Sequence, residues 1–181
     1  MKKFLVLLTI CQIMISCNTE NYPYSDEETE QFLNEVVKNA KATITDLTEI
    51  DRKPADKFGI LTRYTLSKKD QDEYHKNNGT IVNKDGNIYD FNTYNLKDYQ
   101  LKNEKNEVLK FVDNGAAKTL QGLPFGEYEN VLCRNLGIMF NLNKKFEKLN
   151  GFINIEFEMS NGMKKEVKIP VNISINDKVP D

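Results

Sequence analysis

The chain has 181 residues, with 25 basic and 27 acidic side chains interspersed along it and a formal net charge of −2. Nucleic-acid binding requires clustered basic residues, and electrostatic binding to anionic lipid requires a polybasic segment, so this balance argues against both. The length predicts one ordinary domain with enough residues for a hydrophobic core.

The first sixteen residues have the features of a secretory signal. Lys2 and Lys3 supply a positive start, and a mostly apolar run from Phe4 to Ile15 follows them. A transmembrane helix needs about 20 apolar residues, so this run is too short to span a bilayer, and no other stretch is long enough. We therefore expect residues 1–16 to be a signal peptide that is removed from the mature protein.

The signal ends in Met14-Ile15-Ser16-Cys17 and lacks the A-x-A pattern of ordinary cleavage sites. This ending resembles the lipobox of bacterial lipoproteins, in the looser form found in Bacteroidota. The resemblance implies that Cys17 becomes the mature N-terminus and is acylated through its sulfur, so that lipid chains anchor the protein in the bilayer. The expected location is the outer membrane or another envelope membrane, on its periplasmic or its surface face. The alternative is an ordinary secreted protein whose signal happens to contain this cysteine.

The mature chain is expected to begin with a tether, residues 17–25, followed by a single β-rich domain over residues 26–181. Ser25 and Glu28 have the spacing of a helix capping box. Apolar residues then recur at helical spacing from Phe32 to Ala40, which predicts an amphipathic helix from Asp26 to about Ala42. A helix this short is not stable alone, so we expect it to pack on the domain.

Strand patterns follow. Phe58–Leu66 is rich in β-branched and aromatic residues, whereas Lys68–Gly79 is charged and is expected to be a loop. Asp85-Gly86, between short apolar runs at 80–82 and 87–91, predicts a hairpin. Tyr94–Leu101 and Glu107–Val112 form a second expected pair of strands.

The last third of the chain has the clearest pattern. Apolar residues alternate with polar ones from Ile153 to Met159 and again from Val167 to Ile175, with a turn at 160–162 between them. Pro170 cannot donate a ladder hydrogen bond, so it predicts an edge strand or a bulge. Seven to nine strands at this spacing predict a mainly β fold, an antiparallel β-sandwich with one N-terminal amphipathic helix.

One short motif lies before the strand-like run Val131–Leu142. The segment Gly122–Tyr128, GLPFGEY, resembles the L-P-x-G-x-Y turn of prealbumin-like and immunoglobulin-like sandwich domains. Proline restricts φ and glycine permits positive φ, so the segment predicts a tight turn that leads into a strand. The resemblance implies a domain of a kind often used for binding or as a stalk, and it names no ligand.

Cysteine and histidine provide no catalytic or metal signature. Cys133 is the only cysteine left once Cys11 is removed and Cys17 is acylated, so no disulfide is expected, and its apolar surroundings predict a buried, inert thiol. His75 is the only histidine and lies in the charged stretch, where a solvated side chain is expected. A zinc site would need cysteine or carboxylate partners for it.

Acidic and aromatic residues leave more alternatives open. Two groups of side chains have the oxygen ligands that calcium prefers, although neither matches an EF-hand loop. They are Asp70, Asp72 and Glu73, and Asn83, Asp85, Asn87 and Asp90. Acid–base chemistry by a carboxylate pair stays open, because partners can come from different strands. The aromatic residues Tyr89, Phe91, Tyr94 and Tyr99 are expected to be core or strand residues, with exposed rings that stack on sugars or partners as the alternative.

Taken together, the sequence predicts a lipid-anchored, non-enzymatic binding module of the bacterial envelope. No nucleotide-binding, nucleophile-elbow or zinc-protease motif is present, so no cofactor, metal site or catalytic residue is assigned. The expected partners are the bilayer, through acylated Cys17, and another envelope protein or a surface ligand. Two alternatives are an envelope hydrolase or glycan-active protein with an unrecognised carboxylate site, and an immunity or inhibitor lipoprotein.

Overall fold

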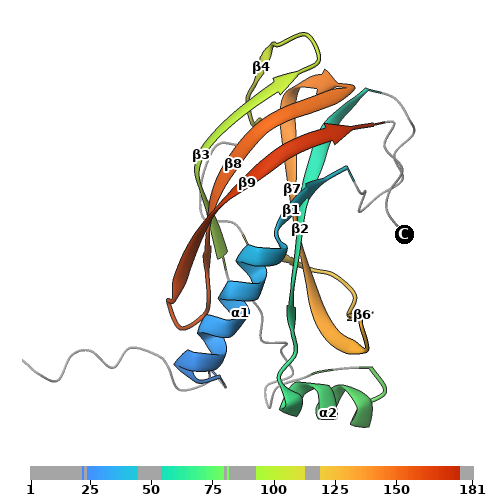
Figure 1. Cartoon of the computed structure of the whole chain (residues 1–181), viewed down its shortest axis with the longest axis vertical. Coiled ribbons are helices and arrows are strands. Elements are labelled where there is room, and N and C mark those ends of the chain that lie inside the picture. Colours follow the sequence, from blue (N-terminus) through green and yellow to red (C-terminus); the bar gives the residue numbers. More distant parts are fainter. Residues whose placement is uncertain are drawn as a thin grey trace, which may run out of the picture.

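The structure of the protein is a computed structural model that describes residues 22, 24–44, 54–79, 81, 93–112 and 119–175. In these residues the chain forms two antiparallel β-sheets packed against each other, with one helix along the side of the sandwich and one at its end (Figure 1). The predicted antiparallel β-sandwich is therefore confirmed.

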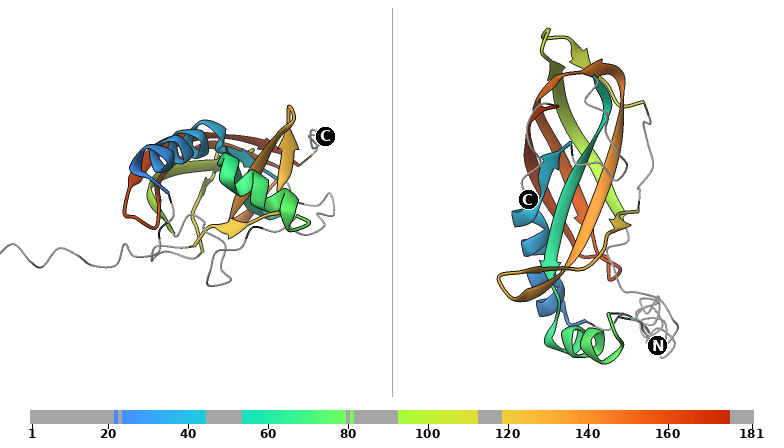
Figure 2. Two further views of the ribbon diagram at one scale, coloured as in Figure 1. Left: turned by 90° about the horizontal axis from the view of Figure 1, so that it is seen from below. Right: turned by 90° about the vertical axis from the view of Figure 1, so that its right-hand side faces the viewer.

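Sheet A contains β1 (Lys41–Thr43), β2 (Ala55–Thr65), β5 (Gln121–Gly122), β6 (Gly126–Tyr128) and β7 (Val131–Phe146). Sheet B contains β3 (Thr93–Asn103), β4 (Val108–Leu109), β8 (Lys148–Glu158) and β9 (Lys164–Ser174). The strand orders are β1-β2-β7-β5, with β6 also paired to β7, and β4-β3-β8-β9. Only Glu147 separates β7 from β8, so the chain passes between the sheets at that residue (Figure 2).

The predicted alternation of β8 and β9 is confirmed. Ile153, Ile155 and Phe157 of β8 are fully buried, and the alternate side chains point to the other face of sheet B. Pro170 lies opposite Phe152 on the outward face of β9, which is an edge strand of sheet B. An edge position suits proline because its missing N–H is not needed by a further strand.

The predicted pair of strands, Tyr94–Leu101 and Glu107–Val112, is observed, but the second segment is divided between the two sheets. Leu109 of β4 pairs with Leu101 of β3, and the turn between them closes through the Asn106 N–H and the Asn103 carbonyl, 3.0 Å apart. The chain then crosses to sheet A, where Phe111 forms a bridge with Leu142. This crossing joins the two sheets at the end of the molecule that is far from the helices (Figure 1).

Helix α1 (Asp26–Asn39) begins as predicted, with both hydrogen bonds of the Ser25–Glu28 capping box in place. It ends three residues earlier than expected, because residues 41–43 form β1 and pair with residues 59–61 of β2. Beyond β1, side chains of α1 cover the rest of this strand edge. The Glu35 carboxylate accepts the Thr65 N–H at 2.6 Å, and the Asn39 amide donates to the Arg63 carbonyl at 3.1 Å.

Residues 68–76 form a helix, α2 (Lys68–Lys76), in addition to the predicted N-terminal helix, so the prediction of a charged loop here was wrong. The helix has no apolar stripe, and hydrogen bonds at its first turn stabilise it. Ser67 caps it by accepting the Asp70 N–H, and the Asp70 carboxylate accepts the hydroxyl protons of Ser67 and Tyr24 at 2.7 and 2.9 Å. The Ser67–Asp70 spacing, serine followed three residues later by an acid, was the signal for this helix.

Two tyrosines of the predicted tether pack on the domain. The Tyr22 hydroxyl is 2.9 Å from the Thr29 hydroxyl of α1, and the Tyr24 ring lies edge-on to Phe32 with centroids 4.9 Å apart. These contacts place Tyr22 and Tyr24 with the folded domain.

Some predictions lie outside the described residues. These are the signal peptide, residues 1–16, most of the tether, and the Asp85-Gly86 hairpin apart from the buried residue Ile81. Among the described residues, neither helix is long and apolar enough to cross a membrane.

Candidate functional site

Cys17, the predicted lipidation site, also lies outside the described residues. The structure does show where the chain enters the domain after it. Tyr22 and Tyr24 pack beside the start of α1, at the end of the sandwich that also carries α2 and the β6–β7 hairpin (Figure 1). Any anchor at Cys17 therefore attaches to this end.

Cys133 is buried in β7, as the sequence predicted, and forms no disulfide. Its Sγ lies 3.7 Å from the Val131 carbonyl. Burial raises the pKa of this thiol, so the nucleophilic thiolate is disfavoured at neutral pH. These surroundings give Cys133 a packing role.

Helix α2 carries one of the two predicted groups of metal-binding candidates, Asp70, Asp72 and Glu73, together with His75. Asp70 is buried and its carboxylate is occupied by Tyr24 and Ser67, whereas His75 is exposed near the helix C-terminus. Within the part of the chain that the structure describes, no three His, Cys, Asp or Glu side chains lie close enough to hold a metal ion together. Asn83, Asp85, Asn87 and Asp90 lie outside that part.

The aromatic stretch is core where it is described. Tyr94 is 4% exposed and meets Phe140 edge-on at 6.1 Å, and the half-buried Tyr99 lies 4.3 Å from Phe111, centroid to centroid. The prediction of core residues is confirmed for these two tyrosines, and Tyr89 and Phe91 lie outside the described residues.

The burial of Tyr94 predicts that the stability of the protein depends on pH in the alkaline range. Burial raises the pKa of its phenol to about 12, above the value of about 10 in an unfolded chain. The stability gained by burying the neutral ring is complete below pH 10 and is lost as the pH rises toward 12. We expect the urea midpoint of the wild type to fall over this range and that of Tyr94→Phe to fall less. Parallel slopes in urea titrations from pH 9 to 12 would contradict this assignment.

The Gly122–Tyr128 motif leads into a strand, but the predicted tight turn is wrong. Gly122 pairs with Leu136 and Gly126 with Cys133, so β5 and β6 follow the same edge of β7 in one direction, and residues 123–125 interrupt the ladder between them. Gly126 is required for close packing, because a Cβ there would lie 2.8 Å from the Asn135 amide nitrogen and 2.9 Å from the Tyr128 ring. The Tyr128 hydroxyl donates to Asn135 at 3.1 Å, and the Arg63 guanidinium stacks 3.7 Å from the Tyr128 ring centroid. These contacts fasten Tyr128 of β6 to Asn135 of β7 and Arg63 of β2 within sheet A.

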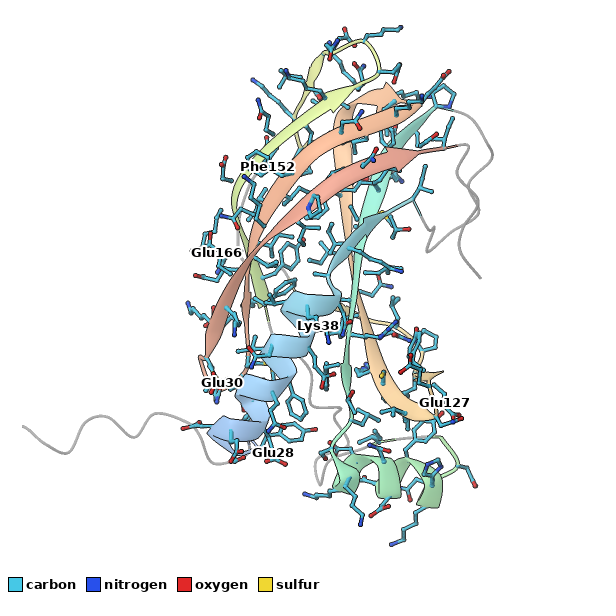
Figure 3. All side chains as sticks on the ribbon, in the orientation of Figure 1. Glu28, Glu30, Lys38, Glu127, Phe152 and Glu166 are labelled. Carbon is cyan, nitrogen blue, oxygen red and sulfur yellow. The ribbon has the colours of Figure 1, made fainter. Side chains whose placement is uncertain are left out.

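The outer face of sheet B carries one aromatic residue, Phe152 of β8 (Figure 3). Gln100 of β3 lies opposite it on one side and Pro170 of β9 on the other. The Lys168 ammonium of β9 lies 3.8 Å from the centroid of the ring. We call this surface the Phe152 face; its members are Gln100, Asn150, Phe152, Lys168, Pro170 and Asn172.

Three residues with amide side chains lie near Phe152 in the register of sheet B. Asn150 precedes Phe152 by two residues on the same strand face, about 7 Å along the strand, and Asn172 lies opposite Asn150 on β9. The side chains of Gln100, Asn150 and Asn172 are exposed, and none donates to or accepts from another described residue. Each amide therefore offers its donors and acceptor to a ligand or to water.

Carboxylates further along sheet B are already paired. Glu156 lies 3.1 Å from Lys97, and Glu158 lies 3.1 Å from Lys164. The hydrogen bond from Lys97, with a further one from Asn95, lowers the pKa of Glu156. A general acid needs a raised pKa, so the surroundings of Glu156 disfavour that role. Glu166, directly opposite Glu156, accepts a hydrogen bond from Asn154.

Sequence reasoning missed Phe152. The alternation from Ile153 to Met159 assigns those apolar residues to the core, and Phe152 has the opposite parity, which places it with the polar residues on the outer face. An aromatic residue at an outward position of a regular strand was the available signal.

Comparison of the chain with protein-family models, curated proteins and solved structures finds no match. A functional proposal for this protein therefore depends on its own residues and their geometry.

Proposed function

We propose that this protein is a lipid-anchored, non-enzymatic binding module of a bacterial cell envelope. The observation that carries the proposal is the Ser16-Cys17 ending of the leader. Tyr22 and Tyr24, a few residues further on, already pack against the core of the domain. Acylated Cys17 anchors the chain in the bilayer, and the sandwich serves as the binding domain. More than one acyl chain is needed for stable anchoring, which a lipidated N-terminal cysteine supplies.

The geometry of the entry point supports this arrangement. Tyr22 comes five residues after Cys17, with four residues between them, and five extended steps of chain span at most about 18 Å. The α1 end of the sandwich is therefore held near the membrane, while the β3–β4 turn at the opposite end points away from it (Figure 1). A partner meets the domain on the sheet faces and at that far end.

The described site residues favour binding over catalysis. Cys133 is buried with a raised pKa, and Glu156 is paired with a lowered pKa. Neither has the electrostatic setting of a nucleophile or a general acid. The outer face of sheet B, by contrast, carries an aromatic ring and amides available for contacts.

The test of the anchor is intact-mass analysis of membrane and soluble fractions from cells that express the full gene. We expect a membrane-bound mature species that starts at Cys17 with added acyl mass. Cys17→Ala should lose both the added mass and the membrane location, because the thiol is the acylated group. Cys11→Ala, in the same leader, is the matched control and should leave both unchanged. An unmodified soluble product cut elsewhere would contradict the anchor.

A further inference from the structure

The Phe152 face has two chemical properties side by side. The Phe152 ring and the Pro170 ring lie on neighbouring strands and provide apolar surface near the centre of sheet B. The amides of Gln100, Asn150 and Asn172 lie beside this apolar surface and are free of other described residues. No described helix or strand lies over this part of the sheet (Figure 3).

A ligand that matches both properties has an apolar face and a rim of hydroxyl groups. A sugar ring presents such a face through its C–H groups, which contact the electron-rich face of an aromatic ring. Side-chain amides both donate and accept, so each can bind a hydroxyl group in either orientation. An apolar protein surface would leave these three amides without partners, which carries a free-energy cost.

Charges of both signs lie near the ring, so this face offers an ionic ligand no single dominant charge to match. The carboxylates that follow Phe152 on β8 are paired with Lys97 and Lys164, and Glu166 is held by Asn154. On the same outer face, Lys102 lies opposite Asn150 and Asp98 lies opposite Asn154. The Lys168 ammonium occupies the ring face that a sugar would use. Lys168 must therefore move aside when a ligand stacks on Phe152.

We infer that the Phe152 face binds a neutral glycan, with one sugar ring stacked on Phe152 and its hydroxyl groups bound by Gln100, Asn150 and Asn172. This inference deepens the proposed function, because it assigns a ligand class to the binding module. Lys168 acts as a cover that competes with the sugar for the ring.

The test is affinity electrophoresis of the full chain, purified in detergent, in native gels that contain a soluble polysaccharide. The probes are the neutral polysaccharides xyloglucan, laminarin, galactomannan and arabinoxylan, with polygalacturonate as the anionic comparison. We expect retention by at least one neutral polysaccharide. Phe152→Ala should weaken that binding about tenfold or more, and Phe152→Leu, which keeps apolar volume but removes the ring, should weaken it as well.

Lys168→Ala separates the neutral glycan from an anionic one. Removing an exposed cation–π contact should strengthen neutral binding about two- to fivefold, whereas an anionic ligand would lose affinity. Val131→Ala, an exposed apolar residue of β7 in sheet A, is the control and should leave retention unchanged. Thermal unfolding of each variant reports whether the fold is kept.

Retention by no neutral polysaccharide would overturn the inference, and so would retention that survives both Phe152 variants. Binding to polygalacturonate alone, lost in Lys168→Ala, would overturn it in favour of an anionic ligand. None of these results affects the acylation of Cys17, so the lipid-anchored module would stand with a different partner. Conversely, loss of the anchor would leave the glycan result intact.

Discussion

Gly151→Ala is expected to lower the free energy of unfolding by about 3 kcal/mol or more, the largest effect we predict for a single methyl group. Gly151 lies within β8, between Leu101 of β3 and Val171 of β9, with φ at +141°. A Cβ built there would lie 1.8 Å from the Gln100 carbonyl oxygen. The clash is with backbone in the middle of sheet B, so no side chain can move away to relieve it.

Gly162→Ala is the matched control, because Gly162 also has a positive φ, +85°, but no atom lies within 4 Å of the added Cβ. The cost there is the backbone strain alone, about 1 kcal/mol. Urea unfolding of both variants, followed by circular dichroism, measures the difference. Equal losses in the two variants would show that sheet B adjusts around the new methyl group, against our expectation.

Leu33→Ala is the second large effect, expected to cost about 3 kcal/mol. Leu33 is 1% exposed, in the face of α1 that also buries Phe32 and Val36 in the core of the sandwich. Truncating it leaves a cavity between α1 and the sheets. Hydrogen bonds between the side chains of Glu35 and Asn39 and the backbone of β2 hold the helix in place, so the structure cannot relax into the cavity.

The control for this prediction is Gln31→Ala, an exposed position of the same helix, which should change stability by no more than about 0.5 kcal/mol. Thermal and urea unfolding of the two variants test whether α1 is an integral part of the domain. If Leu33→Ala leaves the midpoint unchanged, α1 would instead be an appendage of the tether. A separate early transition in circular dichroism would indicate the same.

The elements that local sequence patterns predict well are those whose causes are local. The capping box of α1 needs only Ser25 and Glu28, four residues of chain, and it is present. The alternation of β8 and β9 reflects one buried and one exposed face, and it matches the observed burial from Ile153 onward. Pro170 marks an edge for a reason that lies in the residue itself, its missing N–H.

The errors arose where contacts distant in the chain decide the structure. The end of α1 is set by the pairing of Lys41–Thr43 with β2, some twenty residues away. Helix α2 lacks an apolar stripe and depends on a capping serine and on the bond between Tyr24 and Asp70. Gly126 was expected to serve a turn with positive φ, whereas the structure uses it to let Tyr128 and Asn135 pack closely.

The candidate site was likewise predictable from the sequence only in part. Phe152 could be placed on the outer face from the parity of β8 alone. Its neighbours could not be identified, because Gln100 and Pro170 come from strands whose register is set by pairing, including the irregularity between Leu96 and Asp98 in β3. Only the paired sheet brings the three amides beside the ring.

By itself, the sequence determined the β-rich class and the inward and outward positions of the last two strands, and it predicts the leader and the acylation of Cys17. Each of these follows from residue chemistry or from a period of two along one strand. Only the tertiary structure decided the strand order, the second helix, the packing of Tyr22 and Tyr24, and the composition of the Phe152 face. Those features depend on pairing and packing between distant segments, and a local pattern carries no information about which segments meet.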